Sequence, residues 1–310
     1  IIRKLEDFEK FIEIKYILGD VTQPQLLSNI FKENNIDVVF HSAAYKHVDL
    51  VEKNAIEGIR NNFVSTREIC RVAYSNNVRD VVLISTDKAV RPTNIMGASK
   101  RLSELVMQSY EQKKYLDKDL NKVRPRYSMV RFGNVLGSSG SAVLLFEKQI
   151  KAGGPITITH PDVIRYFMTI KEAALLVIQT LTLTKGGDLF ILDMGEPVRI
   201  KDLAENMVKL SGLTIKDKNN PSGDIEIVTT KLRPGEKLYE ELLIDAKAEK
   251  TKHKLIFRAV EDFIPYSEIR PILDQLEKSL ILHDLKKSLF LLKEIVPEWN
   301  PVDDIFTIKE

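Results

Sequence analysis

The sequence predicts an α/β fold, in which a doubly wound parallel sheet of the Rossmann-like kind is followed by a smaller C-terminal lobe. Through the first half of the chain, short β-branched runs alternate with amphipathic helical stretches. The runs are almost continuously apolar, which is typical of parallel strands that are covered on both faces. Polar residues follow each run, at the edge of an open sheet where ligands bind.

The predicted elements follow one another regularly up to about residue 135. Strands are expected over residues 12–18, 36–40, 80–85 and 127–132, and helices over residues 24–34, 54–75 and 94–113. Later helices are expected over residues 142–151, 171–183 and 200–210, with short strands over residues 188–192 and 225–229. The stretch 267–295 predicts two helices that separate near His283, with Pro271 in the first turn.

This change of rhythm predicts two parts. Residues 1–140 form the core, and residues 141–310 form a substrate-binding lobe from which some strands and helices return to the core.

The composition and charge of the chain argue against several classes of protein. The 46 basic and 44 acidic residues leave a net charge of +2, which is not the electrostatic footprint of a nucleic-acid-binding protein. No run approaches eighteen uninterrupted apolar residues, and the N-terminus is not a signal peptide. The single cysteine, Cys70, lies in an apolar helical pattern, which predicts a buried small hydrophobe in a reducing compartment. We predict no metal site.

Four polar clusters stand where four predicted strands end. They occupy residues 19–21, 41–47, 85–88 and 131–135. Because the carboxyl ends of parallel strands meet at one edge of a sheet, the sequence predicts a single site built from all four clusters.

The cluster at residues 85–88 begins a longer polar segment over residues 85–101. This segment reads Ser-Thr-Asp-Lys-Ala-Val-Arg-Pro-Thr-Asn-Ile-Met-Gly-Ala-Ser-Lys-Arg. This segment resembles the active-site stretch of the polysaccharide-biosynthesis 4,6-dehydratases, a branch of the extended short-chain dehydrogenase/reductase superfamily. Four more segments resemble the same family in the same order, so the resemblance spans most of the chain. They are residues 43–48, 131–141, 165–169 and 233–237.

The resemblance implies a redox-neutral dehydration of UDP-N-acetylglucosamine with tightly bound NAD. The sugar would lose hydride from C4, then a proton from C5 and the C6 hydroxyl as water, and would regain hydride at C6. In the family pattern Asp87 protonates the departing hydroxyl and Lys88 takes the C5 proton. Burial would favour a proton on Asp87 and would lower the pKa of Lys88 toward its neutral form.

One catalytic position departs from the superfamily. The usual Tyr-x-x-x-Lys spacing is kept, but Met96 stands where the tyrosine is expected, before Lys100. A thioether cannot donate or abstract a proton, so Thr86, a water molecule or Asp87 must replace the phenol. The resemblance still implies that Lys100 binds the nicotinamide ribose. The same replacement occurs in the large, membrane-anchored members of the family.

A second departure concerns the glycine-rich turn that holds the pyrophosphate in dinucleotide folds. No strand, glycine turn and helix of that kind precede Ile12. Gly133, Gly137 and Gly140 have a similar spacing, but they follow the active-site helix, where the family has a substrate loop. We therefore expect the first βαβ element to be absent from this chain.

The resemblance also assigns binding residues. Those expected to contact the cofactor are Asp20 and Val21 beside the adenine, Ala43, Ala44, Tyr45 and Ser85 along its length, Asn62 behind the active site, and Val135 near the nicotinamide. Those expected to contact the sugar nucleotide are Lys46, His47, Asn134, Ser141, Thr159, Arg165, Arg233 and Glu236. The arginine fork suits a pyrophosphate, and for His47 a purely structural hydrogen bond is an equal alternative.

We expect a homodimer in the cytoplasm, attached to the cytoplasmic face of the inner membrane only through a segment outside this chain.

Two other functions stay open. A nucleotide-sugar 4-epimerase would share the fold and the cofactor, although Asp87, Lys88 and Met96 argue against it. A non-catalytic protein that binds NAD or a nucleotide sugar would account for the missing tyrosine.

Overall fold

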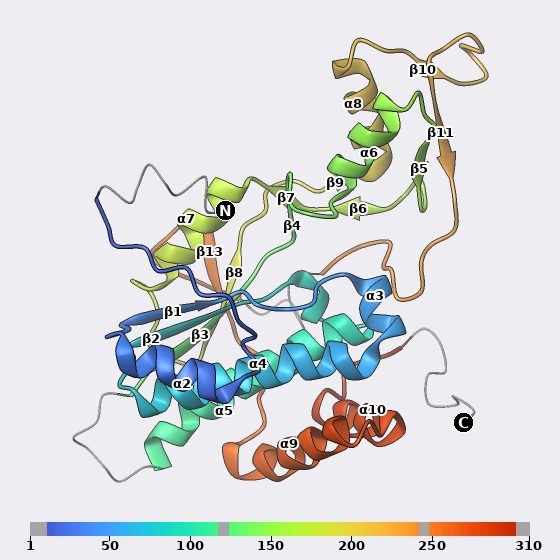
Figure 1. The fold of residues 1–310 in the computed structure, drawn as a ribbon. Helices are drawn as coiled ribbons and strands as arrows, with labels where there is room; N and C mark the ends of the chain where they lie inside the picture. The colour runs from blue at the N-terminus through green and yellow to red at the C-terminus, as the bar shows by residue number, and fades with distance from the viewer. Residues whose placement is uncertain (1–10, 117–123, 242–247, 302–310) are drawn as a thin grey trace.

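The computed structural model describes residues 11–116, 124–241 and 248–301, which form a layered core and a lobe at one side of it (Figure 1). The core contains a six-stranded sheet in the order β1-β2-β3-β8-β13-β12. Four of these strands are parallel: β1 (Val38–His41), β2 (Asp80–Ile84), β3 (Arg126–Arg131) and β8 (Asp188–Leu192). Strands β13 (Ile256–Ala259) and β12 (Ala248–Lys250) continue the sheet in antiparallel order. The predicted fold class is confirmed.

Helices cover both faces of this sheet. On one face lie α2 (Pro24–Glu33), α4 (Ala55–Ser75) and α5 (Ile95–Leu116), and on the other lies α7 (Ile170–Thr180). Strand β2 serves both layers, because Val81 and Leu83 join the first core cluster while Val82 joins the second. This alternation follows from the two-residue period of a strand.

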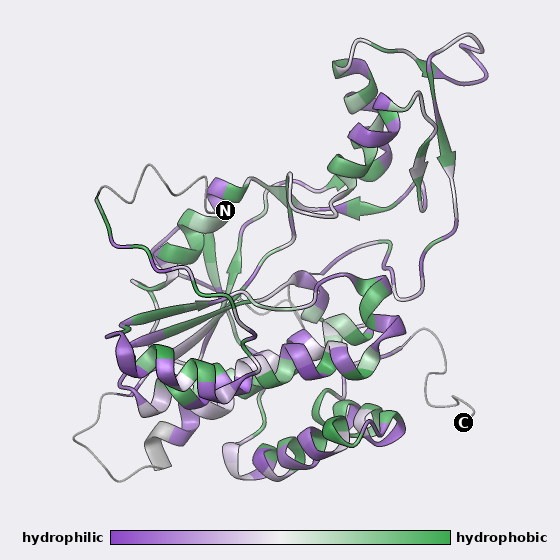
Figure 2. Ribbon diagram, viewed as in Figure 1, coloured by the Kyte–Doolittle hydropathy of each residue, from purple (hydrophilic) through white to green (hydrophobic). Residues whose placement is uncertain are grey.

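A C-terminal helical pair forms an outer layer. Helices α9 (Tyr266–Ile281) and α10 (Leu285–Ile295) pack against α4 and α5, with hydrophobic and hydrophilic residues on different sides (Figure 2). The predicted break is confirmed, since His283 has a positive φ of 55° and the Asp284 side chain accepts from the Lys287 amide at the start of α10. The placement of Pro271 was wrong: α9 begins at Tyr266, so the proline lies inside the helix.

The strand predicted over residues 12–18 is wrong as well. Residues 13–20 have no regular secondary structure, and apolar side chains such as Ile17 and Leu18 are exposed. A strand exists only through pairing, and no described strand pairs with this segment. The outermost strand, β1, pairs with β2 alone among the described residues.

The lobe has its own apolar cluster, drawn from residues 142–238. Helices α6 (Ala142–Lys151) and α8 (Ile200–Leu210) pack on a three-stranded sheet in the order β10 (Ile215–Lys216), β11 (Ile225–Thr229), β5 (Ile156–Ile158). Two short pairs lie between lobe and core: β4 (Asn134–Val135) with β7 (Phe167–Met168), and β6 (Ile164–Arg165) with β9 (Val198–Arg199). The later elements α7, β8, β13, α9 and α10 return to the core. The division of the chain at residue 140 stays a prediction.

The single cysteine lies in the core. Cys70 is buried and its thiol lies 3.2 Å from the Met107 sulfur, so the prediction of a small buried hydrophobe is confirmed. Burial raises the pKa of this thiol well above its ordinary value. Among the described residues, no helix is both long and apolar enough to span a bilayer.

Candidate active site

A cavity of about 410 Å³ lies at the carboxyl edge of the parallel strands. Residues that follow β1, β2 and β3 line it together with the segment before α6 and two residues of α5 (Ile95–Leu116), Met96 and Lys100. The predicted site residues in its wall are Ala44, Lys46, His47, Ser85, Thr86, Lys88, Met96, Lys100, Asn134, Val135 and Ser141. The strand-end clusters at 41–47, 85–88 and 131–135 therefore meet in one site.

Helix α5 positions Met96 and Lys100 on the same wall of the cavity, one turn apart. The ammonium of Lys100 donates to the main-chain carbonyl of Ile84 at 2.7 Å, at the end of β2. Burial lowers the pKa of Lys100 to about 8, against the opposing charge of Glu104. Met96 is buried among apolar side chains, and it supplies no proton-transfer group at this wall.

The segment after β2 holds the predicted acid and base. Asp87 and Lys88 open a short 3₁₀ helix (Asp87–Ala89), and Thr86 stands before it with its hydroxyl accepting from the Lys88 amide. Asp87 Oδ1 accepts from the Thr86 hydroxyl at 2.8 Å and from the Lys88 ammonium at 3.0 Å. Asp87 is fully buried and does not line the cavity, whereas Thr86 and Lys88 do. The carboxylate therefore reaches the cavity through its two neighbours.

The expected protonation of Lys88 needs correction. Burial alone would lower the pKa of Lys88, but the carboxylates of Asp87 and Glu240 outweigh burial and raise it above its ordinary value. Glu240 Oε1 lies 3.6 Å from the Lys88 ammonium. The expectation from the sequence included burial but not this second carboxylate, and the contacts in the structure favour the ammonium form of Lys88 over the neutral amine.

Glu240 is a site residue that the sequence reasoning missed. It is buried and lies between Lys88 and Arg165, whose Nε is 3.8 Å from Glu240 Oε1. Its position three residues after the 233–237 segment was the one available signal.

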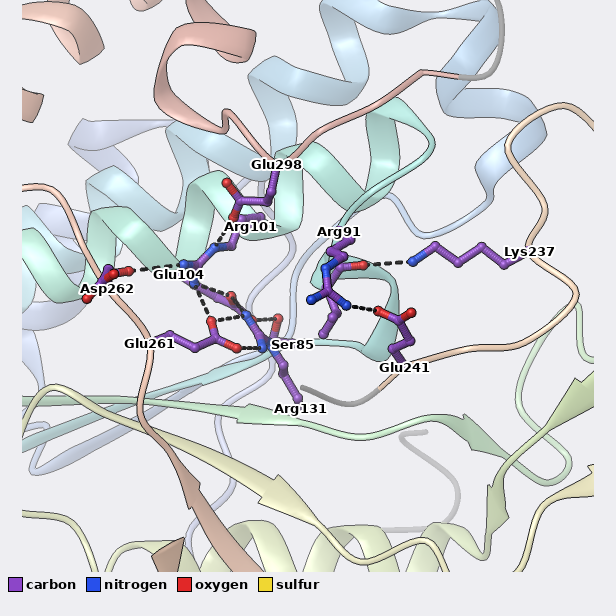
Figure 3. Close-up of polar contacts among 11 residues, drawn as sticks. Ser85, Arg91, Arg101, Glu104, Arg131, Lys237, Glu241, Glu261, Asp262 and Glu298 are labelled. Carbon is purple, nitrogen blue, oxygen red and sulfur yellow. Dashed lines mark hydrogen bonds and ion pairs between the residues drawn. The ribbon is translucent and has the colours of Figure 1, made fainter. Parts of the chain in front are cut away.

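A buried ionic cluster lies behind the cavity (Figure 3). Glu104 of α5 accepts from the Ser85 hydroxyl at 2.5 Å and pairs with Arg131 at the end of β3. Arg131 also binds Glu261, and Arg101 binds Glu104 and Glu298. Arg131 and Glu104 are fully buried. This cluster ties the active-site helix to the segments that follow β13 and α10.

The loop over residues 233–241 is fastened to the segment after Lys88 (Figure 3). Lys237 donates to the Val90 carbonyl at 2.9 Å, and Arg91 pairs with Glu241 at 2.9 Å. Thr93 and Asn94 both donate to the Gly235 carbonyl. These contacts bring Glu240, distant in sequence, against Lys88.

Four assigned sugar-nucleotide residues, two on this loop and two that lie outside it in the sequence, have partners within the protein. Arg165 donates to the carbonyls of Ile164, Lys237 and Leu238, and Thr159 donates to Glu236 at 2.9 Å. Arg233 is exposed and pairs with Asp49 of α3 (Val48–Lys53) at 3.1 Å. None of these assigned residues lines the cavity, so their contact with a sugar nucleotide stays a prediction.

Asn62 of α4 does not line the cavity, and its assignment to the cofactor stays a prediction. Its amide exchanges hydrogen bonds with the main chain of Tyr45 and donates to Ser99 of α5 at 2.9 Å. It holds the loop after β1 against the active-site helix. Ala43 and Tyr45 belong to that loop, and the His47 ring packs against Gly140, where a Cβ would lie 2.5 Å from it.

The predicted cluster at residues 19–21, which includes the two residues assigned to the adenine, does not line the cavity, so three of the four clusters meet there. Asp20 accepts from the amide and hydroxyl of Thr22 at 2.8 Å, which lowers the pKa of its carboxyl and fixes the turn before α2. Val21 packs at the margin of the main core cluster. Their adenine contacts stay predictions.

The buried polar groups at the cavity suit the nicotinamide-ribose end of NAD. Lys100 and Ser85 present polar groups there, beside the small side chain of Ala44 and Val135. The loop from β1 to α3 contains no glycine, so among the described residues it offers no close backbone approach for a pyrophosphate.

The chain is similar to known proteins over most of its length. It is 44% identical over 266 residues to the capsular polysaccharide biosynthesis protein CapD of Staphylococcus aureus, covering 86% of this chain and 42% of that protein. It is 34% identical over 240 residues to a UDP-glucose 4-epimerase of Rickettsia bellii, covering 76% of this chain and 65% of that enzyme. The chain thus spans less than half of the length of CapD.

Solved structures share the fold. Pen from Bacillus thuringiensis superposes with a TM-score of 0.72 at 33% identity, over 88% of this chain and 86% of that chain. DesIV, a dTDP-glucose 4,6-dehydratase from Streptomyces venezuelae solved with NAD and TYD, has a TM-score of 0.66 at 17% identity, over 98% and 87%. The family model described as polysaccharide biosynthesis protein matches residues 2–261, so this chain belongs to the polysaccharide biosynthesis protein family.

Proposed function

We propose that the chain is the catalytic part of an NAD-dependent UDP-N-acetylglucosamine 4,6-dehydratase that serves glycan or capsule synthesis. The observation that carries this proposal is the hydrogen-bonded series Thr86, Asp87 and Lys88, which has two members in the cavity wall. Elimination of water requires an acid and a base side by side. The similarity to CapD supports the pathway, and the NAD in DesIV supports the cofactor.

The proton transfers of the reaction can be assigned to this series. Bound NAD would accept hydride from C4 of the sugar and return it to C6. The Thr86 hydroxyl accepts the C4 hydroxyl proton while passing its own to Asp87, so the phenol that Met96 lacks is not required. Asp87 then holds the proton that the departing C6 hydroxyl needs. Lys88 takes the C5 proton and gives it back to C5, so protons balance and one water is lost.

Lys88 must lose its resting proton before it acts as a base, and this proton leaves to solvent through the cavity, which the Lys88 side chain lines. Protonation of Asp87 removes one of the two carboxylate charges that raise the pKa of Lys88. Transfer of the C4 hydroxyl proton to Asp87 therefore makes deprotonation of Lys88 easier, because the ammonium of Lys88 is less favoured once Asp87 is neutral.

A nucleotide-sugar 4-epimerase is the second candidate, and the similarity to the Rickettsia bellii enzyme favours it. An epimerase needs no acid and base for water loss, and the Asp87 and Lys88 pair would then have no role.

Mass spectrometry of the product formed by the intact parent protein from UDP-N-acetylglucosamine separates these functions. We expect loss of one water without net accumulation of NADH. A product isomeric with the substrate would indicate the epimerase, and no turnover would indicate a binding protein.

A further inference from the structure

We infer that Glu240 is a positioning residue of the proposed reaction: it is the counter-ion that remains beside Lys88 when Asp87 is protonated, and it stabilises Lys88 as the C5 proton arrives. The inference rests on the proposed function for its chemical role. It rests on the structure alone for the contact between the two side chains.

The first observation is the placement of the Glu240 carboxylate. Its Oε1 lies 3.6 Å from the Lys88 ammonium, close enough for a strong charge interaction in a buried setting. The Glu240 side chain is 3% exposed and the Lys88 side chain 23%, so the carboxylate is shielded while the ammonium reaches the cavity.

The second observation is that the Glu240 carboxylate has an incomplete set of hydrogen-bond partners among the described residues. Glu240 Oε2 is buried and has no hydrogen-bond partner among the described residues, although a buried carboxylate normally has its oxygens satisfied. Nothing described thus holds Glu240 more tightly than its two charged neighbours, Lys88 and Arg165.

The charged groups around Lys88 come from three elements. Asp87 lies on the same 3₁₀ helix, Glu240 on the loop after β11, and Arg165 on β6. The Asp87 and Glu240 charges raise the pKa of Lys88, and Arg165 lowers it. When Asp87 holds a proton, Glu240 is the one carboxylate of these three groups that still balances a charge on Lys88.

This arrangement gives Glu240 a defined effect on one step. As Lys88 removes the C5 proton it becomes an ammonium, and the fixed negative charge of Glu240 stabilises the charge that develops. The bond that breaks is C5–H, the bond that forms is N–H on Lys88, and Glu240 exchanges no proton.

The test uses the purified parent protein carrying Glu240→Gln, which keeps the shape of the side chain and removes its charge. The matched control is Glu241→Gln, whose native carboxylate is exposed and pairs with Arg91 on the same loop. Circular dichroism and thermal melting show whether each variant is folded, and Glu240→Asp is the conservative variant that keeps the charge.

The direct readout is trace acylation of Lys88 by acetic anhydride near pH 8, quantified by peptide mass spectrometry against Lys100 in the same cavity. Only a neutral amine reacts, so loss of a carboxylate within about 4 Å should raise the relative acylation of Lys88 about tenfold. Glu240→Asp and Glu241→Gln should leave it near the native value. An unchanged ratio in Glu240→Gln would overturn the inference, whatever the substrate of the enzyme.

Turnover supplies the second readout. If the parent protein dehydrates UDP-N-acetylglucosamine, Glu240→Gln should lower kcat about tenfold or more and increase the isotope effect from C5-deuterated substrate, with KM little changed. An equal loss in Glu240→Asp, or an unchanged isotope effect, would make Glu240 merely structural. If the parent gives no dehydrated product while Lys88 acylation still rises, the proposed function fails and the counter-ion role stands.

Discussion

At the scale of single residues, the reactivity of Lys88 depends on side chains that lie far apart in the sequence. Asp87 precedes it directly, whereas Glu240 reaches it through the loop over residues 233–241. The sequence pattern predicted that Asp87, Lys88 and Lys100 belong to one site, and in the structure Lys88 and Lys100 line one cavity while Asp87 contacts Lys88. The pattern could not give the charge on Lys88, because that charge depends on a contact between distant segments.

Replacing Lys88 by Ala or Asp87 by Asn should abolish dehydration in the intact parent protein. Loss of a general acid or base costs about 10²–10⁴ in rate, and neither substitution adds bulk to the cavity wall. Turnover of UDP-N-acetylglucosamine by each purified variant measures this, with thermal melting to establish folding. Near-native turnover in either folded variant would reject the assignment.

Met96→Tyr tests how oxidation at C4 begins. Because the Thr86 hydroxyl already connects the cavity with Asp87, a restored phenol should leave kcat unchanged or lower it by crowding the buried site. The same turnover assay measures it, beside Met96→Leu as a control of similar volume. A gain of about tenfold, equivalent to about 1.4 kcal/mol of barrier, would mean that Met96 is a damaged catalytic position.

At the scale of elements, the local patterns predicted most helices and strands. Helices α6 and α8 and strands β8 and β11 have the bounds expected from apolar periodicity. The segment over residues 12–18 has an equally good strand pattern and yet forms no strand, because pairing is a property of its neighbours. Glu104 and Arg131 were not singled out either, since their partners come from segments that follow β13 and α10.

The ionic cluster behind the cavity should make a large contribution to stability. Glu104→Gln removes one of the two carboxylates that Arg101 and Arg131 share, the other being Glu261. Breaking a buried pair in this way costs about 3–5 kcal/mol. Equilibrium unfolding in urea measures the free energy of unfolding.

Glu57→Gln is the matched control for this substitution. It removes an exposed pair with Arg60, so we expect a loss below about 1 kcal/mol. A similarly small loss in Glu104→Gln would show that the cluster does not stabilise the fold.

At the scale of the whole molecule, the described residues account for only part of a dinucleotide site. The loop after β1 has no glycine, and α3, the helix that follows it, has six residues. A pyrophosphate normally binds main-chain amides at a helix N-terminus that follows a glycine-rich turn. The outer edge of β1 is also unpaired among the described residues.

We therefore predict that residues 1–310, expressed alone, bind NAD weakly and tend to associate through the open edge of β1. Calorimetric titration with NAD, beside the intact parent protein, provides the comparison. Tight and stoichiometric binding by residues 1–310 would mean that another loop, such as residues 133–140, holds the pyrophosphate.

The predicted homodimer is a separate question at this scale. Helices α9 and α10 already cover part of α4 and α5, so a second copy must use other surfaces or the remainder of these helices. Sedimentation of the intact parent protein measures its oligomeric state.

In the proposed reaction, hydride removed from C4 returns to C6 of the same sugar while one water is lost. Intact parent protein supplied with UDP-N-acetylglucosamine deuterated at C4 tests this most directly, with mass spectrometry and NMR of the product. We expect loss of one water and deuterium at C6 of the product, without release of NADH. Deuterium that stays at C4 in an isomeric product, or that is lost from the dehydrated product, would contradict this expectation.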